Sequence, residues 1–591
     1  MKKHQEEKLL RKDSISGISR RSFLSGAVGA VGLASLGGLA ACSSGASTGD
    51  TKKSSEVAET EKATARREVS SDAEVLGDYD VVVLGAGTAG TCAALAAAEA
   101  GAKTLIVEKT KATGGLSSVS GVIAATESAM QKEAGYDISN DELIKAFRSR
   151  SQNTCHLPLV RNIFERSADT IDWLQANGLG VMLMPPAGIS QGMLSENETF
   201  TAHVMLGATN KTQGENPATK DVNFTGLYNT YFDKHKGEIL LNTTVFKLLT
   251  DESGTVTGVA VDKEDGTEGI INAKKVILAM GAWNADSAEF NEMINTDWVK
   301  QYAPESTNDG TGISIATEIG AQRWGVTPQF HNCWICTLDG EEDYSLRFTE
   351  FTLLLRAPYN MWVNTAGARF ADEAITGDFI EWANVSYSQA GCYYIILDQA
   401  EIDDLEANGT PVETISVYTP EPIKGGNAEL VNAFGMKSGP LTGLQKILDE
   451  YIELGVVAKA DSLEALAKQI NLDPKIFADN VSRYNDKIAA QQDNEFYKDP
   501  KYLLYPLKQG PFYAMRTCTN SEGGMLGGVR VNENLEVLNK ETGHKIENLY
   551  AVGTNAGGFY GTTGAAHYQG CSMSFAVNSG RIAGELATKA L

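Results

Sequence analysis

The sequence predicts an α/β protein built on a parallel β-sheet. Residues 80–84 form a short β-branched run that leads through a glycine-rich turn at residues 85–90 into an alanine-rich stretch at residues 91–100. A second apolar run follows at residues 103–107. Strands of parallel sheets are buried on both faces and therefore read as continuous apolar runs. Strand, glycine turn, helix and second strand in this order predict a βαβ unit.

The length and charge of the chain exclude some classes of function. The chain has 591 residues, with 51 Lys and Arg against 75 Asp and Glu, and a net charge of −24. This length is more than a single domain needs. Because the acidic excess repels a phosphate backbone, we expect no nucleic-acid partner. We also expect only peripheral contact with a membrane, since apolar runs of about 20 residues are confined to the extreme N-terminus.

The first residues are typical of an export signal. Seven Lys and Arg residues come first, and residues 22–41 that follow are mostly apolar and carry no charge. Residues 19–24, with the sequence SRRSFL, resemble a twin-arginine export signal. Residues 39–42, LAAC, resemble a bacterial lipobox. The alternative is a plain apolar leader or a short anchor helix.

These motifs predict how the N-terminal part of the chain is organised. We expect residues 1–41 to be a signal peptide and Cys42 to carry a lipid anchor on the outer side of the cytoplasmic membrane. Residues 42–78 contain few large apolar side chains, so they are expected to form a flexible tether. The folded protein is then expected to begin near Tyr79.

The glycine-rich turn has the pattern G-x-G-x-x-G, and Glu108 follows 18 residues after its last glycine. The first glycine allows a tight turn, the second lets the backbone approach a pyrophosphate, and the third allows close packing of the helix, whose N-terminus favours phosphates. An acid at Glu108 can bind the ribose hydroxyls and repels a 2′-phosphate, which disfavours NADP. The sequence therefore predicts a dinucleotide site formed by Gly85, Gly87, Thr88, Ala89, Gly90, Glu108 and Lys109.

Three further segments favour FAD over NAD. A second glycine turn begins at residue 114, an apolar strand at residues 275–282 ends in small residues, and residues 548–553 form another strand before a helical stretch at residues 572–589. This layout resembles the flavoprotein family of fumarate reductases, urocanate reductases and ketosteroid dehydrogenases. The resemblance covers residues 79–591.

The resemblance implies a Rossmann-like FAD-binding domain with an inserted α+β clamp domain that caps the substrate. It places the FAD-binding domain at residues 79–325 and 511–591 and the clamp at residues 326–510. Because the chain contains no flavin-attachment sequence, FAD is expected to be bound without covalent attachment. Further cofactor-binding residues are expected at the second glycine turn and the later strands, namely Gly114, Gly115, Leu116, Ser117, Val245, Ala279, Gly281, Gly553 and Asn555.

Fumarate reductases of this family hold the substrate carboxylates with His and Arg residues, and these are only partly matched here. The resemblance implies that His331 and Arg356 are kept. At the other matching positions the charged residue is replaced, by Gly377, Gly524, Gly564 and, for a relay glutamate, Leu353. Each lost charge-assisted hydrogen bond is worth roughly 1.5–3 kcal/mol. We therefore expect an activated C=C substrate larger and less charged than fumarate, such as an enone or an aryl acrylate. The alternative is a fumarate- or urocanate-type reductase in which Arg347 or Arg516 enters from another loop.

A replacement proton donor is expected beside the flavin. The resemblance places the loop at residues 558–568 along the ring, so Tyr560 and Tyr568 are the first candidates and Arg356 is the second. His331 and His567 are either catalytic or part of the hydrogen-bonding scaffold. For each tyrosine, the alternative is an apolar wall with a satisfied hydroxyl.

The sequence also bears on the supply of electrons. It contains no haem motif, flavin-attachment sequence or iron–sulfur cysteine array, and we expect no metal site. Cys333 and Cys336 form one C-x-x-C pair, which predicts two buried thiols or a redox-active dithiol. We expect a separate electron donor, a membrane cytochrome or an FMN protein, and an extracytoplasmic reductase of anaerobic respiration. The alternatives are a steroid-type dehydrogenase working in the reverse direction and a non-catalytic flavin electron carrier.

Overall fold

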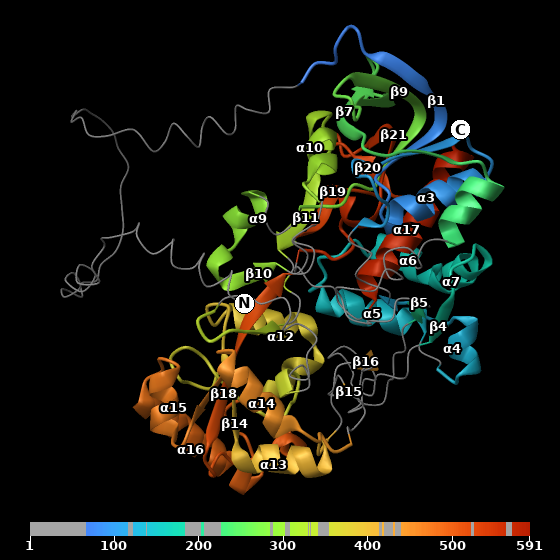
Figure 1. The fold of residues 1–591 in the computed structure, drawn as a ribbon. Coiled ribbons are helices and arrows are strands. Elements are labelled where there is room, and N and C mark those ends of the chain that lie inside the picture. The colour runs from blue at the N-terminus through green and yellow to red at the C-terminus, as the bar shows by residue number, and fades with distance from the viewer. Residues whose placement is uncertain are drawn as a thin grey trace, which may run out of the picture. The chain divides into compact units, whose positions relative to one another are not determined.

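The computed structural model (Figure 1) describes residues 67–115, 122–136, 139–183, 203–205, 226–283, 288–301, 308–328, 330, 333–340, 354–412, 417–418, 430–431, 439–521, 525–562 and 570–591. The expected signal peptide, Cys42 and most of the expected tether lie outside these residues. Arg66–Leu591 form one compact unit.

A largely parallel sheet forms the core of the first domain, in the strand order β20-β21-β9-β1-β2-β6. β1 pairs in parallel with β2 and β9, while β7 and β8 extend the sheet as an antiparallel pair beside β9. The strands are β1 Glu74–Leu84, β2 Thr104–Val107, β6 Glu238–Leu240, β7 Thr244–Thr250, β8 Val256–Asp262, β9 Glu268–Leu278, β20 Glu536–Leu538 and β21 Lys545–Ala551. This sheet confirms the predicted α/β fold, and we call the part of the chain around it the Rossmann-like domain.

Two helices from opposite ends of the described chain pack against each other on this sheet, α3 (Thr88–Glu99) and α17 (Cys571–Lys589) (Figure 1). The contact depends on Gly580 and Gly584. A Cβ atom at Gly580 would overlap the carbonyl oxygen of Ala89 on α3, and one at Gly584 would overlap that of Ala93. Two glycines one helical turn apart therefore let the helix backbones approach closely, and the C-terminal helix becomes part of the N-terminal βαβ unit.

The folded part begins earlier than the expected end of the tether. β1 starts at Glu74 and is paired with β9 from that residue onwards. Arg67 donates hydrogen bonds of 2.6 Å to Asp262 and to Glu268. The prediction of a tether is therefore wrong for residues 67–78, because backbone pairing and ion pairs order a stretch that lacks a large apolar surface.

A second sheet forms the core of the clamp, which we define as this sheet and the helices that cover it. Its strand β18 (Phe512–Ser521) pairs with β10, β12, β14 and β17, and β14 also pairs with β13. The other strands are β10 Val299–Gln301, β12 Cys333–Cys336, β13 Met361–Val363, β14 Tyr394–Asp398 and β17 Val457–Ala460. The expected boundaries at residues 326 and 510 are therefore too narrow, because β10 precedes the first and β18 follows the second.

A third sheet continues from the clamp back to the first domain, in the order β11-β19-β22. Its strands are β11 Arg323–Pro328, β19 Met525–Arg530 and β22 Ala556–Gly557. Two small sheets contain β3 Val122–Ile123, β4 Val181–Leu183 and β5 His203–Met205, and β15 Val417–Tyr418 and β16 Leu430–Val431. The other α-helices among the described residues are α4 Ala129–Glu133, α5 Asn140–Arg150, α6 Leu157–Glu165, α7 Ser167–Ala176, α9 Ala288–Met293, α10 Thr311–Glu318, α12 Phe379–Tyr387, α13 Gln399–Asn408, α14 Leu444–Glu453, α15 Leu463–Gln469 and α16 Pro474–Ala490.

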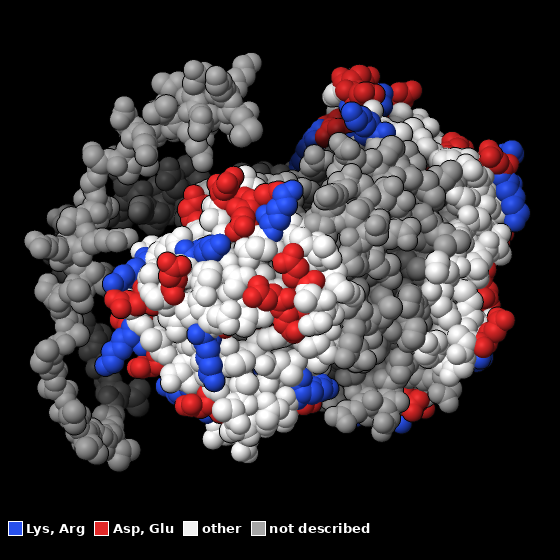
Figure 2. Space-filling model, turned by 60° about the horizontal axis from the view of Figure 1, so that its bottom comes forward, with Lys and Arg blue, Asp and Glu red and all other residues white. Residues whose placement is uncertain are grey.

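Charges of both signs are interspersed over the described surface in Figure 2. Some are paired along helices, as Glu464 is with Lys468 on α15. Among the described residues on this face, no large continuous area is formed by Lys and Arg alone. This face therefore offers no concentrated positive surface to a phosphate backbone.

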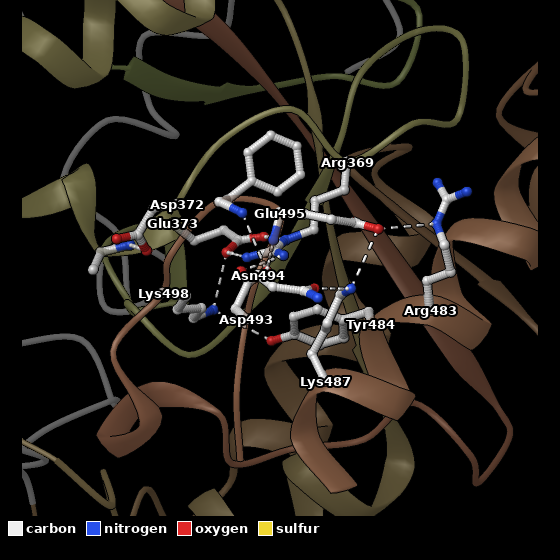
Figure 3. A network of polar contacts seen from close by, with 12 residues as sticks. Arg369, Asp372, Glu373, Arg483, Tyr484, Lys487, Asp493, Asn494, Glu495 and Lys498 are labelled. Carbon is white, nitrogen blue, oxygen red and sulfur yellow. Dashed lines mark hydrogen bonds and ion pairs between the residues drawn. The ribbon is translucent and has the colours of Figure 1, made fainter. Parts of the chain in front are cut away.

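A buried charge network fixes one side of the clamp (Figure 3). Arg369 donates two hydrogen bonds of 2.8 Å to the carboxylate of Glu373 and one of 2.6 Å to Asp493. The ammonium of Lys498 lies 3.1 Å from Glu373 and also donates to the Tyr484 hydroxyl. Burial by itself would raise the pKa of Glu373, but the adjacent charges of Lys498 and Arg369 outweigh burial and hold that pKa below its ordinary value.

Replacing Glu373 by glutamine leaves two buried cations with one carboxylate. We expect Glu373→Gln to lower the free energy of unfolding by about 3–5 kcal/mol in urea unfolding followed by tryptophan fluorescence. The folded-state pKa of Glu373 is lowered, so its contribution is present above the unfolded pKa and is lost as the pH falls through the folded pKa. The variant should therefore depend less on pH in that acidic range. Glu464→Gln, which removes a surface partner of Lys468, is the matched control and should leave the urea midpoint nearly unchanged. Equal stability of Glu373→Gln and the wild type would contradict this role.

Candidate active site

The first glycine turn is shaped by close contacts of the backbone. Gly85 has a φ of 104°, and a Cβ atom there would lie 2.5 Å from the carbonyl oxygen of Ala279 at the end of β9. A Cβ atom on Gly90 would overlap the carbonyl oxygen of Gly85. At Gly87, in contrast, a Cβ atom would meet no atom within 4 Å. The backbone is thus packed against other backbone atoms at Gly85 and Gly90, whereas space is left beside Gly87. This is the arrangement that the spacing predicts for a pyrophosphate site.

The start of α3 fits the phosphates of a dinucleotide. Its N-cap is Gly87, which has no side chain to bond the first N–H groups, and these groups have no partner inside the helix. The hydroxyl of Thr88 is also buried without a hydrogen-bond partner, and the residue is only 2% exposed. Free N–H groups, the positive end of a helix dipole and an unpaired hydroxyl are groups that bind an anion. These groups are compatible with the predicted role of Thr88 and Ala89 in binding the cofactor, which stays a prediction.

Glu108 follows directly after β2 and its carboxylate is held in place. One carboxylate oxygen accepts a hydrogen bond of 2.8 Å from the backbone N–H of Ala86. The other accepts bonds of 2.9 Å from the N–H and the hydroxyl of Thr110. The oxygen bonded to Ala86 keeps a second lone pair that can accept a ribose hydroxyl, whereas both lone pairs of the other oxygen are used by Thr110. Val245 lies two residues beyond Thr243, whose N–H bonds to the Glu108 carbonyl.

Lys109 points to a different partner. Its ammonium lies 2.8 Å from the carboxylate of Asp309, which also accepts the N–H of Thr311 at the start of α10. Burial by itself would raise the pKa of Asp309, but these hydrogen bonds hold it below its ordinary value. Lys109 therefore connects the end of β2 to α10, and a direct contact with the cofactor stays a prediction.

The second glycine turn lies against the first. The N–H of Gly114 donates to the carbonyl of Ala86 at 2.9 Å, and a Cβ atom on Gly115 would lie 3.4 Å from the Cα of Gly87. The backbones of the two turns are therefore in direct contact, and their small residues lie side by side. Leu116 and Ser117, which continue this turn, lie outside the described residues.

The C-terminal segment completes the same edge of the sheet. Ala279 donates from its N–H to the Leu84 carbonyl at 2.9 Å. The amide of Asn555 accepts the N–H of Met280 at 2.5 Å and donates to the carbonyl of Gly281 at 2.7 Å. Gly553 lies against α3, where a Cβ atom would be 3.0 Å from that of Ala89. Both the oxygen and the nitrogen of the Asn555 amide are therefore used in hydrogen bonds that join the segment after β21 to the segment after β9.

The predicted proton donors are placed less favourably. Tyr560 is 2% exposed and packs edge-on against Phe559 and Phe575, with ring centroids 5.0 and 5.9 Å apart. Burial raises the pKa of Tyr560 well above its ordinary value. Arg356 is buried in the other domain, between residues of the clamp core. Three further candidates lie outside the described residues, namely His331, His567 and Tyr568. A catalytic role for each of the five stays a prediction.

Arg516 does not lie on the face of β18 that carries the Arg356 segment. Tyr513 and Met515 pack in the same core as Leu354 and Leu355, while Phe512 and Ala514 pack in the core on the other face. Because side chains alternate along a strand, Arg516 belongs to this other face. Its guanidinium donates to the Leu338 carbonyl at 3.2 Å and to the Cys392 sulfur at 3.8 Å. Arg347, the other displaced cation considered, lies outside the described residues.

The C-x-x-C pair lies on strand β12, where both thiols are free and buried. Alternation directs Cys333 and Cys336 to opposite faces, and three residues of strand span roughly 10 Å, well beyond the Cα separation of about 7 Å that a disulfide tolerates. The two cysteines therefore cannot pair with each other in this structure. Within the described ranges, no group of three or more His, Cys, Asp or Glu side chains is arranged to hold a metal ion.

Sequence reasoning missed one ion pair near the position of the lost arginines. Arg150 at the end of α5 donates to the carboxylate of Asp378, which directly follows Gly377. The partners are 228 residues apart, so no local pattern could have indicated the contact. The only signal was that Asp378 is an acid beside the glycine that stands where the family carries a cation.

Comparisons with known proteins agree with this geometry. A family model described as FAD binding domain matches residues 80–573, so the chain belongs to this family of flavoproteins. The vinyl phenol reductase of Lactiplantibacillus plantarum is 28% identical over 516 residues, which are 86% of this chain and 96% of that protein. The fumarate reductase (cytochrome) of Shewanella frigidimarina is 25% identical over 535 residues, covering 90% of this chain and 81% of that one. The crystal structure of a 3-ketosteroid-Δ4-(5α)-dehydrogenase from Rhodococcus jostii RHA1 matches with a TM-score of 0.64, at 21% identity, over 88% of this chain and 99% of that chain.

The chain is thus an FAD-dependent oxidoreductase of the class that acts on CH–CH groups. The fold of an FAD-binding domain with a capping domain is confirmed. In the part of the chain that the structure describes, no helix combines the length and the apolar character needed to cross a bilayer.

The open space at Gly87 allows a direct test of the FAD site. Gly87 has a φ of −75°, so alanine is tolerated, but its methyl group enters the space assigned to the pyrophosphate. We expect Gly87→Ala to weaken FAD binding at least about tenfold, or about 1.4 kcal/mol, in titrations of the FAD-free protein followed by flavin fluorescence. Gly439→Ala is the matched control, because a Cβ atom there also meets nothing within 4 Å. If both variants bind FAD equally well, the pyrophosphate does not lie at Gly87.

Proposed function

We propose that this protein is an FAD-dependent reductase of an activated C=C bond, with a substrate that is larger and less charged than fumarate, such as an aryl alkene or an enone. The observation that carries the proposal is the pairing of the arginines around residues 373–378. Arg150 is bound by Asp378, and Arg369 is bound by Glu373 and Asp493. The similarity to a vinyl phenol reductase over nearly the whole chain supports the same class of substrate.

The charges of these arginines matter because a dicarboxylate must be compensated in a water-excluded site. Each charge-assisted hydrogen bond to a substrate carboxylate is worth roughly 1.5–3 kcal/mol. A guanidinium already bonded to a buried carboxylate contributes little net positive charge to a nearby ligand. Gly377 adds none, since it has no side chain. A neutral conjugated substrate does not need this compensation.

The residues of the chain contribute binding, enclosure and the proton. Bound FAD supplies the hydride for an electron-poor carbon of the substrate. The two glycine turns and the start of α3 hold its phosphates and orient it, and the clamp excludes water from the reacting carbons. We assign the proton to the hydroxyl of Tyr568 or the guanidinium of Arg356. The Tyr560 hydroxyl is the weaker candidate, because its ring belongs to the aromatic core of the Rossmann-like domain.

A panel of substrates tests this assignment under anaerobic conditions with a reduced viologen as electron donor. We expect kcat/KM for 4-vinylphenol or an aryl enone to exceed that for fumarate at least about 100-fold, which is about 2.7 kcal/mol and corresponds to the loss of one or two charged contacts. Tyr568→Phe and Arg356→Lys should each lower kcat, whereas Tyr502→Phe, in the short 3-10 helix Pro500–Tyr502, serves as the control. A preference for fumarate over every neutral alkene would contradict the proposal.

We further propose that the enzyme works outside the cytoplasmic membrane, anchored by a lipid at Cys42 and supplied with electrons by a separate membrane cytochrome or FMN protein. The support is the order of the two N-terminal motifs, SRRSFL before LAAC. Anchoring near the membrane raises the effective concentration of such a donor. Non-covalent binding of FAD is part of the same proposal.

Export and anchoring are tested in a bacterium with a twin-arginine pathway. Cys42→Ser should move the protein from the membrane fraction to the soluble extracytoplasmic fraction, because the lipid is lost. Replacing both Arg20 and Arg21 by lysine should keep it in the cytoplasm. Cys92→Ser, in the buried helix α3, is the cysteine control. Unchanged fractionation of all variants would refute the anchor, and FAD that is released by acid precipitation would support non-covalent binding.

A further inference from the structure

The pairing of β14 with β18 in the clamp extends beyond the N-terminal end of β14. The two strands are antiparallel neighbours. Just before β14, the N–H of Thr517 donates to the carbonyl of Tyr393 at 2.9 Å, and the N–H of Thr519 donates to the carbonyl of Gly391 at 2.8 Å. Both bonds continue the register of the ladder. The short segment that leads into β14 is therefore paired with β18 as a strand would be.

This register places two cysteines opposite each other, Cys392 beside β14 and Cys518 on β18. They lie between the two hydrogen-bonded positions and so form a non-hydrogen-bonded pair. In such a pair the Cα atoms are about 4.5 Å apart and the two side chains stand on the same face of the sheet. A disulfide needs Cα atoms about 4.4–6.8 Å apart. The backbone therefore holds these two thiols at a separation that a disulfide can bridge.

The contacts of Arg516 show on which face of the sheet the Cys392 sulfur lies. The Arg516 guanidinium donates to this sulfur at 3.8 Å. Arg516 and Cys518 are two residues apart on β18, so their side chains point to the same face. Cys392 and Cys518 are 7% and 5% exposed. The contact with Arg516 therefore agrees with the register, and both sulfurs are assigned to one buried face.

The other two cysteines of this sheet, those of the C-x-x-C pair on β12, do not meet Cys392 or Cys518. Cys333 lies opposite Thr519, so alternation directs its side chain to the other face. Cys336 lies opposite Arg516, diagonally from Cys518, and such diagonal neighbours are about 7–8 Å apart. β12 and β14 pair with opposite edges of β18, which separates Cys336 from Cys392 by two strand spacings. Within this sheet, Cys392 and Cys518 are thus the pair whose geometry allows a bond.

We propose that Cys392 and Cys518 form a modification site that closes to a reversible disulfide between β14 and β18. The oxidant is the disulfide of a small thiol or of a dithiol protein. The thiolate of one cysteine attacks this disulfide, which forms a mixed disulfide and releases one thiol. The thiolate of the other cysteine attacks the mixed disulfide, the protein disulfide forms and a second thiol leaves. The pair loses two electrons and two protons, and these reduce the oxidant to two thiols.

The bond joins parts of the clamp that are distant in the sequence. The chain between the two cysteines includes α13, α14, β17, α15 and α16. In the unfolded chain this long loop keeps the thiols apart on average, whereas the folded sheet holds them side by side. Folding therefore favours the bond, and by linkage the bond stabilises the folded clamp by the same factor. Such bonds persist outside the cytoplasm, the compartment proposed above for this protein.

The test uses the full-length FAD-loaded protein, equilibrated with mixtures of oxidised and reduced glutathione. Remaining thiols are then blocked with N-ethylmaleimide, and tryptic peptides are analysed by mass spectrometry. Trypsin separates the relevant cysteines, because Cys392 falls in residues 370–424, Cys518 in residues 517–530 and the C-x-x-C pair in residues 324–347. We expect residues 370–424 to be linked to residues 517–530, and dithiothreitol to break this link.

The equilibrium constant of the oxidation tests whether the fold itself favours the bond. We expect this constant to be at least about tenfold larger for the folded protein than for the chain unfolded in urea, which is about 1.4 kcal/mol. Cys333→Ser is the matched control, because it removes a buried thiol of the same sheet on the other face, and it should leave the link and the constant unchanged. Cys518→Ser should abolish the link.

Absence of the link between residues 370–424 and 517–530 would overturn the proposal, and so would a link of either peptide to residues 324–347 in its place. A constant no larger in the folded protein than in the unfolded chain would overturn it as well. If Cys518→Ser does not fold, the linked peptides of the wild type and of Cys333→Ser still decide the question. The inference goes beyond the proposed function. Since no alkene is needed in these measurements, the two proposals fail independently.

Discussion

The structure depends on the close approach of three backbone segments around the start of α3. The turn at Gly85 lies against the Ala279 carbonyl, Gly90 lies against the Gly85 carbonyl, and Gly580 of α17 lies against the Ala89 carbonyl. A side chain at any of these positions would overlap the facing carbonyl oxygen and push a strand or a helix outward. A closely packed protein interior has no free space for such a shift. The cofactor site therefore cannot form until the chain has passed through the clamp and returned with α17. One consequence is that the clamp is inserted within the chain of the Rossmann-like domain, although each domain has its own core.

The parts of the fold that the sequence predicted are those set by local order. The strand, turn, helix and acid between residues 80 and 108 could be assigned because each role depends on residue type and spacing alone. The domain limits could not, because membership of a sheet depends on pairing between distant segments. β10 and β18 pair in parallel although more than 200 residues separate them, and Arg67 is ordered by Asp262, 195 residues away. Short polar stretches therefore look like linkers until their partners are known.

In the candidate site, too, the residues set by local sequence could be predicted and those set by distant segments could not. Its glycines and Glu108 were predicted, and the structure places those that it describes along one edge of the sheet, at Gly87, Gly114, Ala279 and Gly553. The surroundings of Phe559 and Tyr560 were not predictable, since Phe147 and Phe164, which contact Phe559, and Phe575, which contacts Tyr560, come from three helices far apart in the sequence. The C-x-x-C motif was ambiguous for a different reason. Its meaning depends on whether the backbone is a helical turn or an extended strand, and on β12 the two sulfurs cannot meet.

Three buried cations in the clamp and at its border are bound by carboxylates of the chain itself. Arg369 and Lys498 are bound by Glu373 and Asp493 inside the clamp, and Arg150 is bound by Asp378 across its border. Buried charges of this kind are costly when single and tolerable when paired, so a substrate carboxylate would have to displace an existing partner and leave it unpaired. A substrate without charge imposes no such exchange. Under the proposed function, this pairing is the reason why a neutral substrate is favoured over a dicarboxylate.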